Sequence, residues 1–142
     1  MEENFLEITE MLGKINGCYE EWFQKSGANF FQVQVAFSII AGATTQDEIC
    51  KKFKMPKQTV NKVIKDFQRN NYLTLETEEI DSRRKKILLT ESGKDFIEKI
   101  SEPLINFDRK VFNRIGKRNF QKLLAGMTAY EKALREELEV MK

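Results

Sequence analysis

The chain has 142 residues, of which 24 are Lys or Arg and 22 are Asp or Glu, so its formal net charge at neutral pH is +2. This length suits one domain. A composition of 41% hydrophobic and 32% charged residues, with two prolines and seven glycines, excludes a long disordered or linker-rich chain. Met1 leads into acidic residues, and no long stretch lacks polar breaks. We therefore expect no secretory signal, no membrane span and a cytoplasmic location.

Residues for several kinds of catalysis are missing from the sequence. There is no histidine, which is the usual general base at neutral pH and the commonest transition-metal ligand. The two cysteines, Cys18 and Cys50, lack the spacing of a zinc knuckle or a disulfide framework. Glycine-rich phosphate loops and nucleophile elbows are absent too. The sequence therefore predicts no catalytic residues, no metal site and no cofactor, and so a protein that is not an enzyme.

The small net charge conceals an uneven distribution. Residues 1–43 carry six acidic and two basic side chains, residues 44–90 carry seven and eleven, and residues 91–142 carry nine and eleven. Between positions 51 and 70 the basic side chains are accompanied by a single carboxylate, Asp66. Positive charge concentrated in one module is what a polyanion-binding surface requires, because contact with phosphates releases condensed counterions. A solvated helix face would explain the same charges.

The first predicted element is a long amphipathic helix over residues 4–25. Its apolar residues recur in steps of three and four, as Phe5, Ile8, Leu12, Ile15, Tyr19 and Trp22. Ser26 and Gly27 end this helix. A short apolar helix over residues 31–40 follows, which we expect to be buried on nearly all sides and to stop near Gly42.

Residues 45–71 predict two short helices joined by a tight turn. Thr45 and Glu48 form the pattern of a capping box at the start of the first helix. Pro56 suits the first position of the second helix, and Asn71 suits the left-handed conformation at its end. The residues expected to face inward are Ile49, Cys50, Phe53, Val60, Val63, Ile64 and Phe67. Two helices of this kind form a helix-turn-helix.

Two strands follow directly. Residues 72–77 alternate between apolar and polar, and residues 86–89 are mostly apolar. The polar residues 78–84 between them predict the tip of a hairpin. Beside a helix-turn-helix, such a hairpin is a wing, and the name wing is kept here for residues 72–89.

Two long helices are predicted after the wing. Thr90 caps the first, which spans residues 91–115 and should be bent by Pro103, and the second starts near Gly116. The apolar residues of the last helix recur in heptad-like steps, as Phe120, Leu123, Leu124, Met127, Tyr130, Leu134, Leu138 and Met141. The apolar stripes of the first and last helices could each be intramolecular core. One small domain rarely needs two such helices, so their exchange between the subunits of a homodimer is favoured.

The stretch from Thr44 to Gly93 resembles the core of the MarR family of bacterial transcription regulators, and the order of elements matches over nearly the whole chain. The most specific piece is Asp81-Ser82-Arg83 followed by Leu-Thr-Glu-Ser-Gly at residues 89–93. The resemblance implies a mainly α fold with a small β-hairpin. In it, a single domain spans residues 1–142, with a winged helix-turn-helix module at 30–100 and dimerisation helices at 1–26 and 101–142. Two departures are Asn71, where the family mostly has Gly, and the missing histidine, which argues against the zinc-responsive branch.

The resemblance implies that each subunit of a homodimer places the second helix of the helix-turn-helix in a major groove of double-stranded DNA. The side chains expected to read or contact DNA there are Lys57, Gln58, Thr59, Asn61 and Lys62. Amide side chains can pair with adenine, and lysine can address guanine. In the wing, Arg83 would enter the minor groove, oriented by Asp81, while Arg84 and Lys85 would contact phosphates. Thr45 would add a phosphate contact, although its capping role explains it equally well.

The resemblance also implies a pocket for a small apolar or phenolic effector, between the dimerisation helices and the DNA-binding module. The candidate lining residues are Trp22, Phe30, Phe31 and Phe37. Packing in the core would explain the same aromatic residues. Cys50 is expected in the core, and Cys18 is either a small buried hydrophobe or a redox-sensing thiol, as in some members of the family.

The function that these observations favour is sequence-specific binding of operator DNA by a dimeric, effector-responsive repressor. The alternative is a winged-helix interaction module that binds protein or RNA. The basic, polar start of the second helix and Arg83 favour DNA, because a protein-binding wing would more often carry apolar residues at these places.

Overall fold

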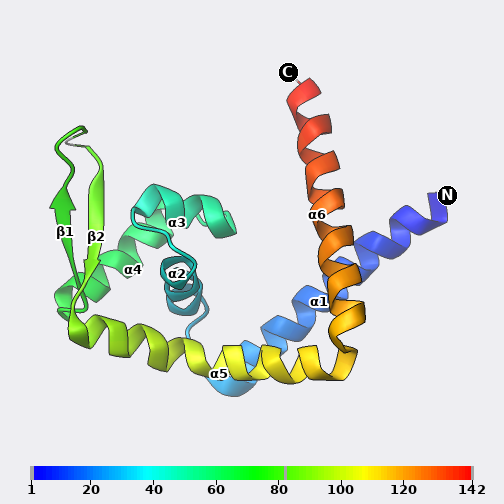
Figure 1. Ribbon diagram of the computed structural model, residues 1–142, viewed down its shortest axis with the longest axis horizontal. Helices are drawn as coiled ribbons and strands as arrows, with labels where there is room; N and C mark the ends of the chain where they lie inside the picture. Colours follow the sequence, from blue (N-terminus) through cyan, green and yellow to red (C-terminus); the bar gives the residue numbers. More distant parts are fainter. Residues whose placement is uncertain (1, 82, 142) are drawn as a thin grey trace. The chain divides into compact units, whose positions relative to one another are not determined.

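The computed structural model describes residues 2–81 and 83–141, with side chains from Asn4 onward. Ser82, in the middle of the predicted wing motif, lies outside the described residues. Over the described ranges the elements are α1 (Glu2–Ser26), α2 (Phe30–Ile40), α3 (Gln46–Phe53), α4 (Lys57–Arg69), β1 (Leu73–Thr77), β2 (Lys85–Leu89), α5 (Glu91–Ile115) and α6 (Lys117–Val140) (Figure 1). This order confirms the predicted mainly α fold with a small β-hairpin.

The chain divides into two compact units, Met1–Ser101 and Glu102–Lys142. The first unit contains α1 to β2 and the start of α5, and the second contains the rest of α5 and α6. The boundary lies within α5, next to Pro103, which is inside the helix. Proline removes one backbone donor from the helical ladder. All the residues expected to contact DNA belong to the first unit.

Helix α2 begins at a capping residue and ends before a glycine. The side chain of Asn29 accepts a hydrogen bond from the backbone N–H of Gln32 at 3.0 Å, which satisfies a free donor of the first turn. Gly42 has a φ of +101°, which a residue with a Cβ adopts only with strain. The expectation that α2 is buried on nearly all sides is wrong for the single chain. Phe31 and Ile40 are 48% and 53% exposed, because only one side of α2 packs on α3 and α4.

Helix α3 has the predicted cap, with one change of partner. The Thr45 hydroxyl accepts a hydrogen bond from the N–H of Glu48 at 3.3 Å. The Glu48 carboxylate reaches back to the N–H of Thr44 at 2.6 Å, one residue before the cap, and this bond holds the pKa of Glu48 below its usual value. Phe53, predicted to face inward, is exposed. Pro56 lies at the cap of α4, one residue before the predicted position.

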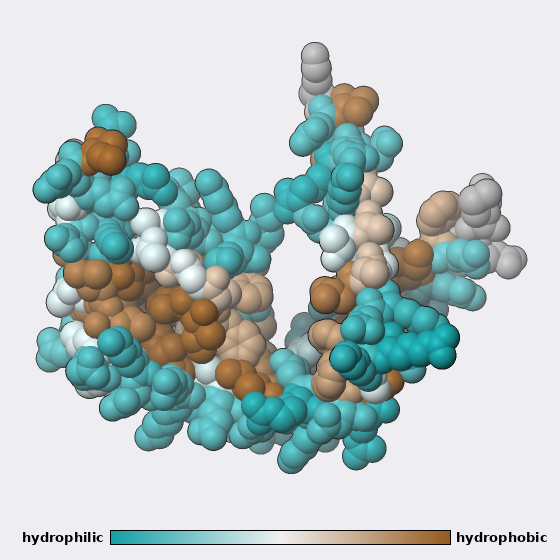
Figure 2. All heavy atoms as spheres, in the orientation of Figure 1, coloured by the Kyte–Doolittle hydropathy of each residue, from teal (hydrophilic) through white to brown (hydrophobic). Residues whose placement is uncertain are grey.

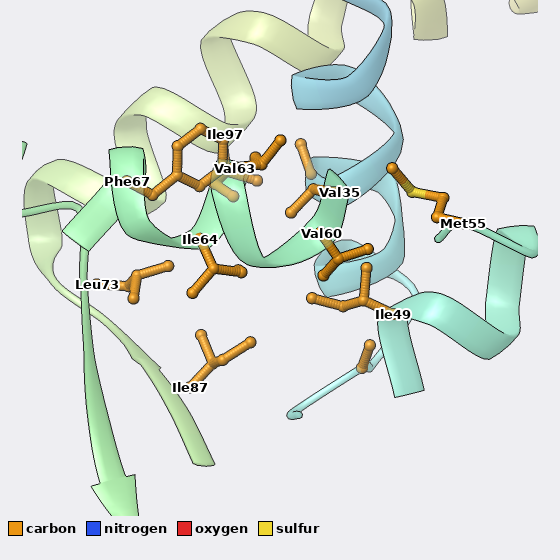
Figure 3. Close-up of a cluster of buried hydrophobic side chains, with 12 residues drawn as sticks. Val35, Ile49, Met55, Val60, Val63, Ile64, Phe67, Leu73, Ile87 and Ile97 are labelled. Carbon is orange, nitrogen blue, oxygen red and sulfur yellow. The ribbon is translucent and has the colours of Figure 1, made fainter. Parts of the chain in front are cut away.

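The core of the first unit surrounds one face of α4 (Figure 3). Four buried side chains of α4 belong to it, and they follow the predicted helical spacing: Val60, Val63, Ile64 and Phe67. The other buried residues of the cluster are Val35, Ala36, Ala43, Ile49, Met55, Leu73, Ile87 and Ile97. Because α4 commits this face to the core, its opposite face is left for solvent or a ligand.

The end of α4 depends on Asn71, as predicted. Asn71 has a φ of +61°, its N–H donates to the carbonyl of Gln68 at 3.0 Å, and the N–H of Tyr72 donates to Phe67 at 2.9 Å. These two bonds form a Schellman motif. The rings of Phe67 and Tyr72 also contact each other edge to face, with their centroids 6.2 Å apart. The turn therefore sets where the wing leaves α4.

Replacing Asn71 with alanine is expected to lower the free energy of unfolding by about 1 kcal/mol, because alanine pays a steric penalty in the left-handed conformation. Replacing it with glycine should leave stability unchanged or slightly higher. Urea unfolding of both variants checks this. Gln68→Ala, an exposed helical position, is the control that should change little. Equal stabilities of Asn71→Ala and Asn71→Gly would contradict the interpretation.

Strands β1 and β2 of the wing pair as an antiparallel ladder, and a further segment that was not predicted pairs with β2. Leu75 of β1 lies opposite Ile87 of β2. On the other edge of β2, the N–H of Ile87 donates to the carbonyl of Thr44 at 2.7 Å, and Thr45 forms an isolated bridge with Lys86. The linker between α2 and α3, residues 41–45, thus pairs with β2 and connects the wing to the helix-turn-helix.

The start of α5 is fixed to the end of α4. The Thr90 hydroxyl caps α5 by accepting from the N–H of Gly93 at 3.0 Å, and it donates to the carbonyl of Asn71 at 2.7 Å. The N–H of Thr90 donates to the carbonyl of Tyr72 at 3.0 Å. Gly93 lies directly against Tyr72, where a Cβ would be 2.6 Å from the carbonyl carbon. These contacts confirm the predicted cap and place α5 against the base of the wing.

The apolar stripes of both terminal helices are exposed. In α1 the exposed apolar side chains are Phe5, Leu6, Ile8, Met11, Leu12, Ile15 and Tyr19. In α6 no described residue is buried, and its stripe runs from Phe120 to Leu138, with Met141 just after the helix. The buried core of the first unit therefore includes no residue of α1, and α6 contributes no buried residue among those described. Among the described helices, none combines the length and the low charge that a bilayer span requires.

Candidate nucleic-acid interface

The polar side chains at the front of α4 lie off the face that packs in the core. Lys57, Gln58 and Lys62 are exposed, and Thr59 and Asn61 are partly buried. A shallow concavity on this face is lined by Gln58, Asn61, Lys62, Lys65, Asp66 and Arg69. The structure therefore brings three of the five predicted residues together with two further cations. Lys65 and Arg69 continue the surface in helical steps from Asn61, a spacing that the sequence analysis did not use.

The tip of the wing is a closed turn built around Asp81. Its carboxylate accepts a hydrogen bond from the backbone N–H of Arg83 at 2.9 Å. Its carbonyl accepts from the N–H of Arg84 at 3.0 Å, and the N–H of Glu78 donates to the carbonyl of Arg84 at 3.1 Å. Asp81 thus acts on the backbone that carries Arg83. The exposed guanidinium is left at the end of the hairpin.

A second concavity joins the start of α3 to the wing. Its lining residues are Thr45, Gln46, Asp47, Arg83, Arg84 and Lys85. Sheet pairing between the linker and β2 explains why these segments, far apart in the sequence, meet. Thr45 is only 4% exposed and its hydroxyl caps α3, so Gln46 and Asp47 supply the accessible polar groups of α3 here. These two residues were not predicted from the sequence, because the pairing that brings them to the wing is long-range.

The charges of this region are mostly basic but include carboxylates. Glu48 lies near Arg84, and this proximity adds to the effect of the Thr44 N–H in keeping the pKa of Glu48 low. Glu48 therefore stays charged at neutral pH and holds the linker that pairs with β2. Arg83, Arg84 and Lys85 line the concavity and are all exposed, and they outnumber the one exposed carboxylate there, Asp47.

The aromatic residues predicted to line an effector pocket are only partly brought together. The rings of Trp22, Phe23, Phe30 and Phe31 form a row of edge contacts, with successive centroids 5.0, 5.0 and 5.4 Å apart. Phe23, which links the row, was not predicted. Phe37 lies farther along α2 and is half-buried. Phe30 and Phe31 are both exposed, whereas Trp22 and Phe23 are partly buried.

The two cysteines have different surroundings. Cys18 is exposed on α1, and Cys50 is half-buried against the core, where burial raises the pKa of its thiol. Cys50 was predicted to lie in the core, and its side chain packs at the edge of the core. Among the described residues, no group of three or more acidic or cysteine side chains is arranged to hold a metal ion.

These features define a winged helix-turn-helix protein, and comparison with known proteins shows which family it resembles. Residues 27–84 match the model of the MarR family. A MarR family regulator from Neisseria meningitidis has a similar structure, with a TM-score of 0.79 and 25% identity over 96% of each chain. No curated protein sequence matches the chain.

Two staphylococcal structures share the fold. Staphylococcus aureus MarR in complex with salicylate and kanamycin has a TM-score of 0.68 and 21% identity over 91% of this chain and 93% of its own. Staphylococcus aureus MepR in complex with DNA has a TM-score of 0.62 and 17% identity over 89% and 94%. The predicted resemblance to the MarR family is thus confirmed. The winged helix-turn-helix module matches the family model, and nearly the whole length of the chain has the fold of MarR family transcription regulators.

Proposed function

We propose that this protein is a sequence-specific regulator that binds double-stranded operator DNA as a homodimer and acts as an effector-responsive repressor. The observation that carries the proposal is the division of α4 into two faces. One face is buried in the core through Val60, Ile64 and Phe67, while the other presents amides and cations in a shallow concavity. A helix held in this way can enter a major groove without losing its packing.

The wing supports the same function. Three exposed cations, Arg83, Arg84 and Lys85, lie at the end of a hairpin that is hydrogen-bonded to the helix-turn-helix. A narrow minor groove attracts arginine, and phosphates attract both cation types. MepR, which shares this fold, has been solved with DNA. We assign Arg83 to the minor groove, Arg84 and Lys85 to phosphates, and Lys57, Gln58, Thr59, Asn61 and Lys62 to the major groove.

The exposed stripes of α1 and α6 support a homodimer. Contiguous apolar surface of this extent is unusual on a monomer, and covering it with a second copy removes it from water. Twofold symmetry would present two copies of α4 to a pseudo-palindromic site, with half-sites about one helical turn, or roughly ten base pairs, apart.

The aromatic row supports a small apolar or phenolic effector. Trp22, Phe30 and Phe31 offer ring faces and edges that are exposed or half-buried. Aromatic side chains suit a ligand with a ring, because offset and edge-to-face ring pairs are favourable. MarR from Staphylococcus aureus, with the same fold, has been solved with salicylate, an aromatic acid, and with kanamycin. Phe37 is assigned to the same pocket.

A winged helix that binds protein or RNA is the competing function. A protein-binding wing would present mainly apolar residues, whereas this one carries three exposed cations, Arg83, Arg84 and Lys85, beside the exposed Ile80 at its tip. Double-stranded RNA has a deep, narrow major groove that a helix such as α4 does not enter. Both arguments favour DNA.

Replacing Arg83 with alanine tests the proposal. The affinity for duplexes selected by the wild-type protein from a randomised library should fall roughly tenfold or more, and most for sites with A·T-rich flanks, where the minor groove is narrow. The slope of log K against log salt should fall by about one, because the variant lacks one cation that displaces condensed counterions from the duplex. Fluorescence anisotropy over a range of salt concentrations measures both quantities.

Two control variants separate the kinds of contact. Lys85→Ala should lower the salt slope by about one while weakening all sequences alike. Asn61→Ala should relax base preference within the half-site, by about 1–3 kcal/mol for a good bidentate pair, with little change of slope. Wild-type binding with no sequence preference, or to RNA in preference to DNA, would refute the proposed function. Unchanged binding by Arg83→Ala would refute the role of the wing.

A further inference from the structure

Ile80 is almost completely exposed, with 99% of its surface accessible to water. It lies in the loop between β1 and β2, and Figure 2 shows hydrophobic atoms surrounded by hydrophilic ones at the outer end of this hairpin. The cluster of buried side chains that stabilises the first unit does not include it. An exposed isoleucine is unremarkable on a broad surface, but this one occupies the tip of the element that carries Arg83.

The turn itself gives no reason for an isoleucine. Backbone bonds from Glu78 to Arg84 and from Arg84 to Asp81 close the loop, and the Asp81 carboxylate holds the N–H of Arg83. Residues that favour turns are Gly, Pro, Asn, Asp and Ser, each for a conformational or hydrogen-bonding reason that isoleucine does not share. Neither folding of the loop nor packing of the core therefore explains Ile80.

The charges of the wing indicate which part of it approaches DNA. The strand that leads to the tip is acidic and the strand that leaves it is basic, with Glu76 directly opposite Lys86 in the ladder. Glu79 comes just before Ile80, and Arg83 follows in the same closed turn. Phosphates repel the acidic side and attract the basic side. The wing would thus meet DNA with its basic side and its apex, and Ile80 is the apolar residue of the apex.

We infer that Ile80 is a DNA-contact residue, whose side chain enters the minor groove together with Arg83 and packs against deoxyribose and base edges. The inference rests on the proposed function of the wing. Apolar side chains that enter the minor groove partly unstack a base step and bend the duplex, and pyrimidine–purine steps unstack most easily. Ile80 would therefore favour operators that carry such a step where the wing tip enters.

The test compares Ile80→Ser with Ile80→Leu on a duplex selected by the wild-type protein from a randomised library. Ile80→Ser should raise the Kd about five- to twentyfold, since it removes apolar contact area. The salt slope should equal that of the wild type, because no charge is lost, whereas Arg83→Ala lowers it. Ile80→Leu should stay within about twofold of the wild type. The urea midpoint of both variants should be unchanged, because the side chain is in water in the free protein.

Three results would overturn the inference, and they are distinguishable. If Ile80→Ser binds as tightly as the wild type at every salt concentration while Arg83→Ala is weakened, Ile80 has no DNA contact and the proposed function stands. If Ile80→Ser alters the sedimentation of the DNA-free protein, the side chain contacts a second copy instead. If the wild type selects no sequence from the library, the inference and the proposed function fail together.

Discussion

Replacing Gly93 with alanine is expected to lower the free energy of unfolding by about 3 kcal/mol. A Cβ at this position would lie inside the contact distance of the Tyr72 carbonyl group, 2.6 Å from its carbon and closer still to its oxygen. Backbone atoms cannot rotate away as a flexible side chain can. The start of α5 would have to move, and the bonds from Thr90 to Tyr72 and Asn71 would lengthen or break.

The matched control is Gly17→Ala, also a glycine at a helical position. Nothing lies within 4 Å of a Cβ there, so the substitution should stabilise the protein by about 0.5–1 kcal/mol through the helix propensity of alanine. Urea unfolding followed by circular dichroism measures both variants. If Gly93→Ala is as stable as the wild type, then α5 does not need its close approach to Tyr72, and the glycine of the Leu-Thr-Glu-Ser-Gly run has another role.

The ends of the elements were predictable because they depend on local chemistry. Thr45 and Thr90 cap α3 and α5 through their own hydroxyls, and Asn71 and Gly116 supply the positive φ at which α4 ends and α6 begins. Each of these signals involves residues within about four positions of one another. The core face of α4 was predictable for the same reason, since Val60, Val63, Ile64 and Phe67 repeat at helical spacing.

Contacts between distant segments were not predictable from one sequence. The pairing of Thr44 with Ile87 joins residues more than forty positions apart, and nothing in either residue indicates the other. That pairing also explains why Gln46 meets the wing. The close approach of Gly93 to Tyr72 is a contact of the same kind, visible in the sequence only as a motif without its cause.

In the candidate site, too, some residues could be predicted from local patterns in the sequence and others could not. The front of α4 and the wing cations were predicted as DNA contacts from composition and from the family resemblance. Lys65, Arg69 and Ile80 were not among the predicted DNA contacts. Lys65 and Arg69 follow Asn61 at helical spacing, so the pattern of α4 in the sequence already places all three on one face. Ile80 is different, because an isoleucine in a loop is usually read as buried, and only its exposure identifies it as available for a contact.

Replacing Leu134 with glutamate is expected to convert the proposed homodimer into a monomer at micromolar concentrations. Leu134 is 47% exposed on the apolar stripe of α6, and a partner subunit that covers the stripe would bury it. A carboxylate introduced there would lose its hydration without gaining a partner, which costs several kcal/mol and weakens association at least a hundredfold. Sedimentation velocity measures the change. Because a dimer is needed to contact two half-sites at once, binding to a full operator should fall to that of a single half-site.

A charge on the opposite side of α6 is the control for this prediction. Ala125 lies nine residues before Leu134, about half a turn away around the helix, and it is exposed. Ala125→Glu adds the same charge to the same helix, and should leave both sedimentation and operator binding unchanged. Far-UV circular dichroism separates a folded monomer from an unfolded chain, and Leu134→Ala, which removes contact area without a charge, should give a weaker dimer that still forms. A wild-type protein that sediments as a monomer would refute the homodimer. Equal dimerisation of Leu134→Glu and Ala125→Glu would instead exclude the α6 stripe from the interface and leave the stripe of α1 as the surface through which two copies meet.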